Sequence, residues 1–158
     1  MLTLITVGKL KEKFYLSAAA EYEKRLKAFG GVRLVELPEV RLPEDPSPAQ
    51  IRQALEKEAE AVRQKLPKNA WLCVLTPEGK LLSSEALADT IQAVRNRGKS
   101  ELVFLIGSSF GLDEGLKKQG DLLLSMGPMT FPHHLARIMV LEQLYRAESI
   151  LAGSRYHK

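Results

Sequence analysis

The sequence predicts an α/β fold in which a mostly parallel sheet is flanked by helices. Strand-like apolar runs alternate with amphipathic helical segments along the whole chain, which is typical of this class. The run Leu-Val-Phe-Leu-Ile within 101–106 is apolar at every position, as expected for a parallel strand that is covered on both faces. The length of 158 residues suits one domain, and no repeat or linker divides it, so we expect residues 1–158 to form a single unit.

The first three elements are expected to be a strand, a helix and a second strand. Residues 2–7 are apolar apart from two threonines, and residues 32–37 alternate between two faces, so both segments are predicted strands. Between them, 14–29 carries leucine, alanine and tyrosine near one face of a helix. Two consecutive glycines at 30–31 are expected to end this helix.

The next segment combines a loop, a helix and a third strand. Prolines and acidic residues at 38–46 indicate the loop. A Ser-Pro pair then begins a helix over 47–66, because serine is a favoured N-cap and proline suits the first helical position. Residues 70–75 form the third predicted strand, and Thr-Pro-Glu-Gly at 76–79 predicts a turn.

The alternation of helix and strand then continues. A serine pair begins the helix predicted over 83–98, and a glycine closes it. The fourth strand, 101–106, is followed by a Gly-Ser-Ser-Phe-Gly loop at 107–111. A short helix at 113–118 and a fifth strand at 121–125 complete the predicted sheet.

The last third of the chain is a glycine- and proline-containing loop at 126–131 that opens into one long helix, 132–151. The apolar residues of this helix lie nearly all the way round it, which is typical of a helix buried on more than one side. In so small a chain, this pattern predicts that a second subunit covers the helix. Burial on one side only, in a monomer, is the alternative.

Charge and cysteine content narrow the class of protein. The formal net charge is +4; residues 1–37 and 117–158 each carry +3, which suits a polyanionic partner without requiring one. The single cysteine, Cys73, lies in an apolar run, so we expect a buried core residue in a cytoplasmic protein.

The apolar N-terminal segment is too short to span a membrane. It also lacks the order of a signal peptide, in which basic residues precede the apolar run.

Three loops are expected at the carboxyl ends of strands, where open α/β sheets bind their ligands. They lie at 75–79, 106–111 and 126–131, and their glycines let the backbone approach a ligand closely. The sequence has neither the dinucleotide-binding fingerprint nor a P-loop, and no Cys/His/Asp cluster has metal-ligand spacing. Dinucleotide enzymes, NTPases and metal centres are therefore not supported.

Polar groups gather on the final helix and in the tail. All three histidines follow residue 132, and Glu142 and Arg146 are spaced four residues apart, as in a pair on one helix face. The tail 155–158 reads Arg-Tyr-His-Lys, which suits an RNA phosphate and base. A frayed chain end is the ordinary alternative.

Several motifs along the chain carry a family resemblance. They are Val-Gly-Lys-Leu-Lys-Glu-Lys at 7–13, Glu-Tyr-Glu-Lys-Arg-Leu at 21–26, Phe-Leu-Ile-Gly at 104–107, Met-Thr-Phe-Pro-His at 129–133, Glu-Gln-Leu-Tyr-Arg-Ala at 142–147 and Tyr-His-Lys at 156–158. With these motifs the chain resembles the bacterial SPOUT-class methyltransferases that modify N3 of a pseudouridine in large-subunit ribosomal RNA.

The resemblance implies a C-terminal trefoil knot, a homodimer, and S-adenosyl-L-methionine as methyl donor with no metal. It implies 23S rRNA in the assembled ribosome as substrate, and neither DNA nor a membrane as partner. The cofactor-binding positions that it implies are Leu75, Gly107, Met126, Gly127, Pro128, Met129, Thr130 and Phe131. Those that it implies for substrate binding or catalysis are His133, Arg137, Glu142, Arg146, Tyr156 and His157.

Within this resemblance the mechanism is a hypothesis. Methyl transfer is an in-line displacement, so the enzyme mainly aligns the donor methyl group with N3. The N3 proton must leave, and His157 is the candidate base because histidine ordinarily titrates near pH 6.5, about neutrality. Tyr156 would stack on or orient the base, and Arg146 would stabilise negative charge on the imide. The short tail is expected to complete the site of the partner subunit.

Two positions depart from the usual family pattern. Ser108 stands where the family usually has the second glycine of Ile-Gly-Gly, and Pro128 removes an amide donor from the last loop. We expect Ser108 to weaken cofactor binding if that position needs a positive φ or a close approach, with activity surviving. Three alternatives stay open: a non-catalytic ribosome-associated factor that binds S-adenosylmethionine, a methyltransferase for another RNA such as transfer RNA, and a nucleotide-binding switch.

Overall fold

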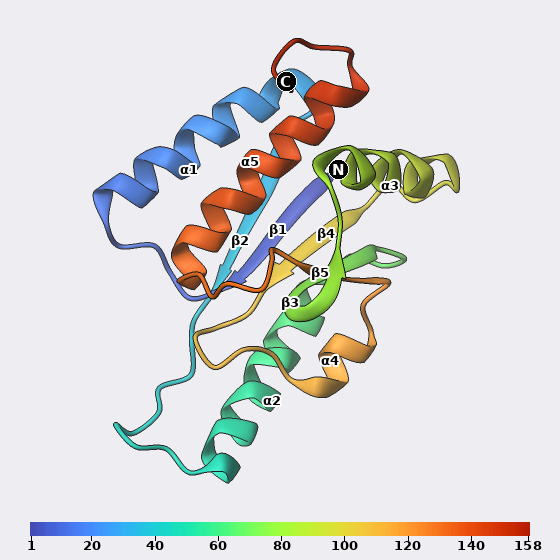
Figure 1. Cartoon of the computed structure of the whole chain (residues 1–158). Coiled ribbons are helices and arrows are strands. Elements are labelled where there is room, and N and C mark those ends of the chain that lie inside the picture. The colour runs from blue at the N-terminus through green and yellow to red at the C-terminus, as the bar shows by residue number, and fades with distance from the viewer.

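Five parallel strands form the sheet at the centre of the molecule (Figure 1). The computed structural model describes residues 1–158. The strands lie in the order β2-β1-β4-β3-β5, and every neighbouring pair is parallel. They are β1 (Leu2–Val7), β2 (Val32–Leu37), β3 (Trp71–Leu81), β4 (Leu102–Ile106) and β5 (Leu122–Ser125). The carboxyl ends of all five strands therefore meet at one edge of the sheet.

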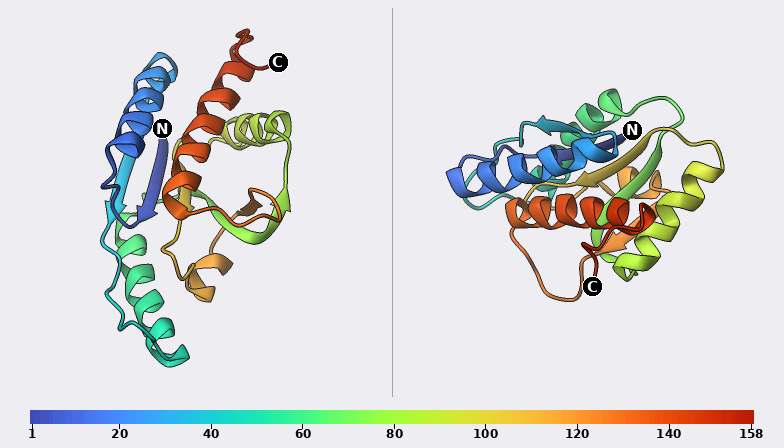
Figure 2. Two further views of the ribbon diagram at one scale, coloured as in Figure 1. Left: turned by 60° about the vertical axis from the view of Figure 1, so that its left-hand side comes forward. Right: turned by 90° about the horizontal axis from the view of Figure 1, so that it is seen from above.

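Helices cover both faces of this sheet, so the predicted α/β architecture is confirmed (Figure 2). The helices are α1 (Lys13–Leu26), the 3₁₀ helix η1 (Lys27–Phe29), α2 (Pro48–Lys65), α3 (Ser84–Asn96), α4 (Glu114–Lys118) and α5 (His133–Leu151). Helices α1, α3 and α5 share one hydrophobic cluster with the sheet, and α2 and α4 share the other. Alternate residues of β4 point into the two clusters, as its unbroken apolar run predicts.

Local sequence signals set the helix ends as expected. The Ser47 hydroxyl accepts a hydrogen bond from the Gln50 amide, and the Gln50 side chain accepts one from the Ser47 amide, which forms a capping box at the start of α2. Ser83 caps α3 in the same way through the Ala86 amide, at 3.0 Å. Gly30, at a φ of 98°, ends the first helical segment.

The predicted turn at 76–79 is wrong, because β3 continues through these residues to Leu81. The pairing of β3 with β5 shifts register between Leu75 and Lys80, so the proline and glycine form a bulge. At Gly79 a side chain would meet the backbone of Leu123 at 2.6 Å. Strand β5 pairs with β3 both before and after the Pro-Glu-Gly segment. This segment therefore forms a bulge within β3 and does not end the strand.

Helix α5 packs against α1 and α3 on one face of the sheet. Its core side is apolar, and Leu141, Leu144 and Ala147 are fully buried there. Leu135 stays exposed and Met139 half-exposed on the opposite side of the helix. A single chain therefore buries only part of the apolar surface of α5.

Two simpler expectations concern the cysteine and the membrane. Cys73 is a free, fully buried thiol, and burial raises its pKa, so it is the core residue that the sequence predicts. No helix of the structure has the length and apolar content that a membrane span needs.

Candidate functional site

The three predicted loops converge on one pocket of about 270 Å³ at the carboxyl edge of the sheet, which we call the strand-end pocket. All eight positions that the resemblance implies for the cofactor line it: Leu75, Gly107, Met126, Gly127, Pro128, Met129, Thr130 and Phe131. Lys117 of α4 and His133 of α5 complete the wall. Residues separated by more than fifty positions in the chain thus share one cavity because the parallel strands end together.

Glycines shape two walls of the strand-end pocket. At Gly107 a side chain would clash with the carbonyl of Gly111 and would meet Leu112 Cγ at 2.6 Å, so only glycine allows the turn 107–111 to close. The amide of Gly111 donates to the Ser108 carbonyl at 2.9 Å within this turn. Gly127 has a φ of 123°, and its amide donates to the Ser125 hydroxyl at 3.1 Å.

Ser108 fits its position without strain. Its φ is not positive, so the backbone does not need glycine here. Its side chain is buried, and its hydroxyl donates to Glu58 Oε1 at 2.9 Å. The backbone reason for expecting weaker cofactor binding, a need for positive φ, is therefore absent at this residue.

The strand-end pocket combines apolar side chains with polar backbone. Leu75 and Leu112 give it apolar walls, and the loops around them carry backbone amides and carbonyls. The hydroxyl of Thr76 is buried in the wall and has no hydrogen-bond partner in the protein. A ligand with a flat apolar ring and polar edges suits these surroundings.

His133 begins α5 at the rim of the strand-end pocket. Burial lowers the pKa of this histidine, and the neighbouring His134 lowers it further. Glu39 opposes this shift with its negative charge. At neutral pH the imidazole is therefore uncharged and can accept a proton.

Arg137, one turn further along α5, is occupied inside the protein. Its side chain is 3 % exposed; Nη1 pairs with Glu36 at 2.5 Å, and Nη2 donates to the Gly8 carbonyl at 2.7 Å. Burial raises the pKa of Glu36, but Arg137 and the Leu10 amide more than offset this, so the pKa lies below its usual range. The guanidinium binds α5 to the ends of β1 and β2 and does not line the strand-end pocket.

The other implied residues form a second group near the C-terminal end of α5, which we call the tail cluster: Glu142, Arg146, Tyr156 and His157. Arg146 donates to Glu142 Oε1 through Nε at 2.9 Å and Nη2 at 2.5 Å, as the spacing predicts. The Tyr156 hydroxyl donates to the same oxygen at 3.1 Å, and its ring lies under the Arg146 guanidinium at 4.8 Å. Burial and Glu142 raise the pKa of Tyr156 to about 12, so its hydroxyl keeps its proton.

Both ring nitrogens of His157 have partners. Nδ1 lies 3.1 Å from Arg146 Nη1, and Nε2 lies 2.5 Å from Glu85 Oε1. An arginine only donates, so Nδ1 accepts and the ring proton lies on Nε2, where it is donated to Glu85. In this docked position His157 has no free nitrogen to accept a substrate proton.

The strand-end pocket and the tail cluster lie apart along α5. His133 and Arg146 are thirteen residues apart in one continuous helix, which corresponds to about 20 Å at 1.5 Å per residue. The structure thus brings the eight loop residues and His133 together, and separately the tail residues with Glu142 and Arg146. It does not bring these two groups together within one chain.

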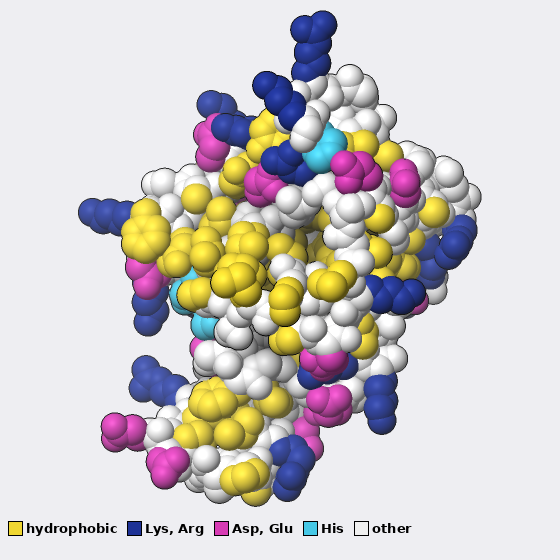
Figure 3. All heavy atoms as spheres, viewed as in Figure 1, with side chains coloured by type: hydrophobic (Ala, Val, Ile, Leu, Met, Phe, Trp, Pro, Cys, Tyr) yellow, Lys and Arg dark blue, Asp and Glu magenta, His cyan; other side chains and the backbone are white.

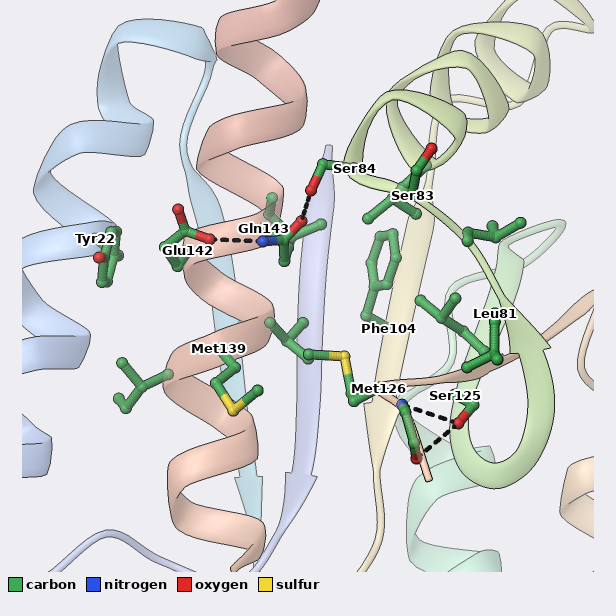
Figure 4. A pocket seen from close by; sticks show the side chains of 17 residues that line it. Tyr22, Leu81, Ser83, Ser84, Phe104, Ser125, Met126, Met139, Glu142 and Gln143 are labelled. Atoms are coloured by element: carbon green, nitrogen blue, oxygen red, sulfur yellow. Dashed lines mark hydrogen bonds between the residues drawn. The ribbon is translucent and has the colours of Figure 1, made fainter. Parts of the chain in front are cut away.

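A larger apolar groove of about 560 Å³ lies beside α5, and we call it the helix groove (Figure 4). Ile138 and Met139 of α5, Leu87 of α3 and Met126 are among its lining residues. At one end, Gln143 accepts a hydrogen bond from the Ser84 hydroxyl at 2.6 Å. The groove shares Met126 and Gly127 with the strand-end pocket, so the two cavities border the same loop.

Several large apolar side chains are exposed. They include Phe14, Leu16, Leu81, Met129 and Leu135, with Leu81 70 % and Met129 75 % exposed. Hydrophobic side chains gather over α5 and the start of α1 on this face of the molecule (Figure 3). A single chain leaves this surface open to water, which is typical of an interaction surface.

Sequence reasoning missed the acidic partners of the site. Glu36 and Glu85 pair with Arg137 and His157 across 101 and 72 residues, and Glu58 reaches Ser108 across 50. These carboxylates follow no motif, and only the folded chain shows which cation or hydroxyl each one meets. The structure has no group of three or more histidine, cysteine, aspartate or glutamate residues that could hold a metal ion.

Comparison with known proteins assigns the family. A family model described as "Predicted SPOUT methyltransferase" matches residues 1–157. The chain is 45 % identical to ribosomal RNA large subunit methyltransferase H of Streptococcus mutans and 43 % identical to the proteins of that name from Leuconostoc citreum and Streptococcus suis, over 155 residues in each case. Each match covers 98 % of both chains. The chain therefore belongs to the SPOUT methyltransferase family.

Proposed function

We propose that this protein transfers a methyl group from S-adenosyl-L-methionine to N3 of a pseudouridine in the large-subunit (23S) ribosomal RNA of the assembled ribosome. One observation carries the proposal: all eight positions expected to bind the cofactor line the strand-end pocket. The names of the relatives, which are ribosomal RNA large subunit methyltransferases, support the substrate class. A ribosomal substrate implies that the protein works in the cytoplasm.

The residues of the strand-end pocket fit this cofactor. Leu75 and Leu112 offer apolar contact to an adenine ring, and the unpartnered Thr76 hydroxyl offers a hydrogen bond to a polar edge. The turn 107–111 and the loop 126–131 supply backbone groups around it. When bound, the cofactor supplies an electrophilic methyl group, and no metal takes part.

The tail cluster is proposed to handle the substrate base. Tyr156 keeps its proton at neutral pH, so its hydroxyl stays a donor to Glu142 while its ring is offered to the base for stacking. Arg146 stabilises the negative charge that develops on the imide when the N3 proton leaves. The His157 ring first breaks its contact with Arg146, which frees Nδ1. This nitrogen then takes the N3 proton.

Two copies of the chain are needed to unite these parts. The strand-end pocket and the tail cluster are about 20 Å apart along α5, so one chain does not bring both to the same base. We propose a homodimer in which the tail of one subunit completes the pocket of the other. The helix groove and the exposed apolar side chains form the surface that the second copy covers.

A C-terminal trefoil knot is part of the proposal. Strand β5 lies at the sheet edge beside β3, yet α5 packs against α1 as well as α3. The loop 126–131 therefore returns across the sheet, and it crosses the connection from β3 to α3 in Figure 1. Both segments line the helix groove, which supports threading of one past the other.

His133 is the second candidate for the base. It lines the strand-end pocket, and burial together with His134 keeps it uncharged at neutral pH. The two candidates differ in the pH dependence that their replacement produces. If His157 is the base, His157→Ala removes the acid limb of the kcat profile, whereas His133→Ala keeps it.

The proposed function is tested with labelled S-adenosylmethionine and ribosomes that lack the modification. Free large subunits and deproteinised rRNA serve as parallel substrates, and mass spectrometry identifies the product nucleoside. We expect label at N3 of pseudouridine with assembled ribosomes and none with bare RNA. Cofactor binding without label on any RNA would instead identify a non-catalytic ribosome-associated factor.

A further inference from the structure

Glu58 of α2 is a buried carboxylate for which the proposed mechanism has no use. The residue is 5 % exposed, and both of its oxygens accept hydrogen bonds. Oε1 accepts from the Ser108 hydroxyl at 2.9 Å, and Oε2 accepts from the Val40 amide at 2.8 Å. The side chain therefore joins helix α2 to two loops that are far apart in the sequence.

This carboxylate is costly to bury. No lysine, arginine or histidine forms an ion pair with it, so its two hydrogen bonds are its compensation. Burial raises the pKa of Glu58, and the negative charge of Glu39 adds to the effect. A glutamine or an apolar residue avoids this cost, which indicates that the acceptor pair has a use of its own.

The position of Ser108 points to that use. Ser108 belongs to the turn 107–111 and lines the strand-end pocket. The next residue, Ser109, donates to Glu39 Oε1 at 2.7 Å, so a second hydrogen bond joins this turn to the segment that contains Val40. Two carboxylates, neither of which lines the pocket, thus accept hydrogen bonds from the turn.

We infer that Glu58 is a positioning residue that holds the turn 107–111 in its ligand-binding shape through the Ser108 hydroxyl, and that it ties the loop 38–46 to the same turn. The inference rests on the proposed function, since it takes the strand-end pocket as the cofactor site. It also gives Ser108 a role: a glycine at this position provides no side-chain donor for Oε1.

The charge state of Glu58 matters to this arrangement. The ionised carboxylate accepts from both donors, whereas a protonated carboxyl group turns one oxygen into a donor. The facing charged group is Glu39, whose own hydrogen bond comes from Ser109. As the pH falls through the raised pKa of Glu58, the turn loses one of its acceptors, and cofactor affinity is expected to fall with it.

Calorimetric titration of the full-length protein with S-adenosylmethionine between pH 5 and 8 tests the inference. Glu58→Ala should weaken binding about tenfold at pH 7.5, the effect of one hydrogen bond to a charged group. Glu58→Gln, like the protonated carboxyl group, keeps an oxygen for the Val40 amide but presents a donor to Ser108, so at pH 7.5 it should bind as weakly as the wild type does at low pH and show no acid dependence. The exposed neighbour Glu60 provides the matched control, Glu60→Gln, which should change nothing.

Hydrogen exchange of the unliganded proteins gives a readout that does not need the cofactor. In Glu58→Ala the amides of Val40 and Gly111 should exchange faster, while those of β1 keep their protection. Equal affinity and equal pH dependence in wild type and both Glu58 variants would overturn the inference. If the wild type binds no S-adenosylmethionine, the proposed function is wrong. In that case, unchanged hydrogen exchange of the Val40 and Gly111 amides in Glu58→Ala would by itself overturn the positioning role of Glu58.

Discussion

Replacing Arg137 with methionine should destabilise the fold by about 3 kcal/mol. The guanidinium is 3 % exposed, and the variant leaves Glu36 and the Gly8 carbonyl without their shared donor. Removal of one partner of a buried ion pair costs about 3–5 kcal/mol. The lower end applies here because Glu36 is 39 % exposed and water can solvate it in the variant. Because methionine keeps most of the apolar part of the arginine side chain, the loss of unfolding free energy measures the missing polar contacts.

Denaturant unfolding, followed at several protein concentrations, measures this change. In thermal unfolding of a chain of 158 residues, a loss of 3 kcal/mol corresponds to a fall in Tm of about 6–12 °C. A double-mutant cycle with Glu36→Gln separates the ion pair from the bond to Gly8. A loss below 1 kcal/mol would refute the reasoning, and unchanged stability together with lost methyl transfer would give Arg137 a direct role at the substrate.

The pH dependence of the same variant has a defined sign. The pKa of Glu36 is lowered in the folded protein, because Arg137 and the Leu10 amide outweigh burial. A lowered carboxyl pKa contributes stability above the unfolded value of about 4.3, and this contribution is lost as the pH falls through the folded pKa. The stability difference between wild type and Arg137→Met should therefore shrink below pH 4, and a constant difference would contradict this account.

Three further predictions concern the two cavities and the tail. Gly107→Ala should abolish cofactor binding in calorimetry, because the added methyl group would meet Leu112 Cγ at 2.6 Å; retained affinity would show that the turn relaxes. Tyr156→Phe should lower kcat and leave the KM for S-adenosylmethionine unchanged, because the lost hydrogen bond to Glu142 lies in the tail cluster; a raised KM alone would contradict this. Met139→Asp should yield monomers in sedimentation, since it places a charge in the helix groove; an intact dimer would exclude this groove as the interface.

Much of the fold follows from short-range signals in the sequence. The limits of β1 and β2, the serine N-cap of α2 and the all-apolar run of β4 depend on residues close together in the chain, and each lies where expected. The eight loop positions also share one pocket, because parallel strands bring their ends together.

The misses have a physical cause in common. The extension of β3 past Leu75 depends on β5, a partner strand some fifty residues further along the chain. The partners of Arg137 and His157 are even more distant in sequence, so no local pattern identifies Glu36 or Glu85. Hydrophobic periodicity predicts which residues are buried. The sequence position of a charged side chain does not predict which of the many opposite charges it will contact.

In the proposed dimer, helix α5 is a rigid spacer between the strand-end pocket and the tail cluster. An insertion of one residue between His133 and Arg146 rotates everything beyond it by about 100°, because the helix has 3.6 residues per turn. Seven residues restore the original face but add about 10 Å to the helix. No small insertion or deletion preserves both direction and distance, so natural variation in chain length is expected in the loop 38–46 and not in this helix.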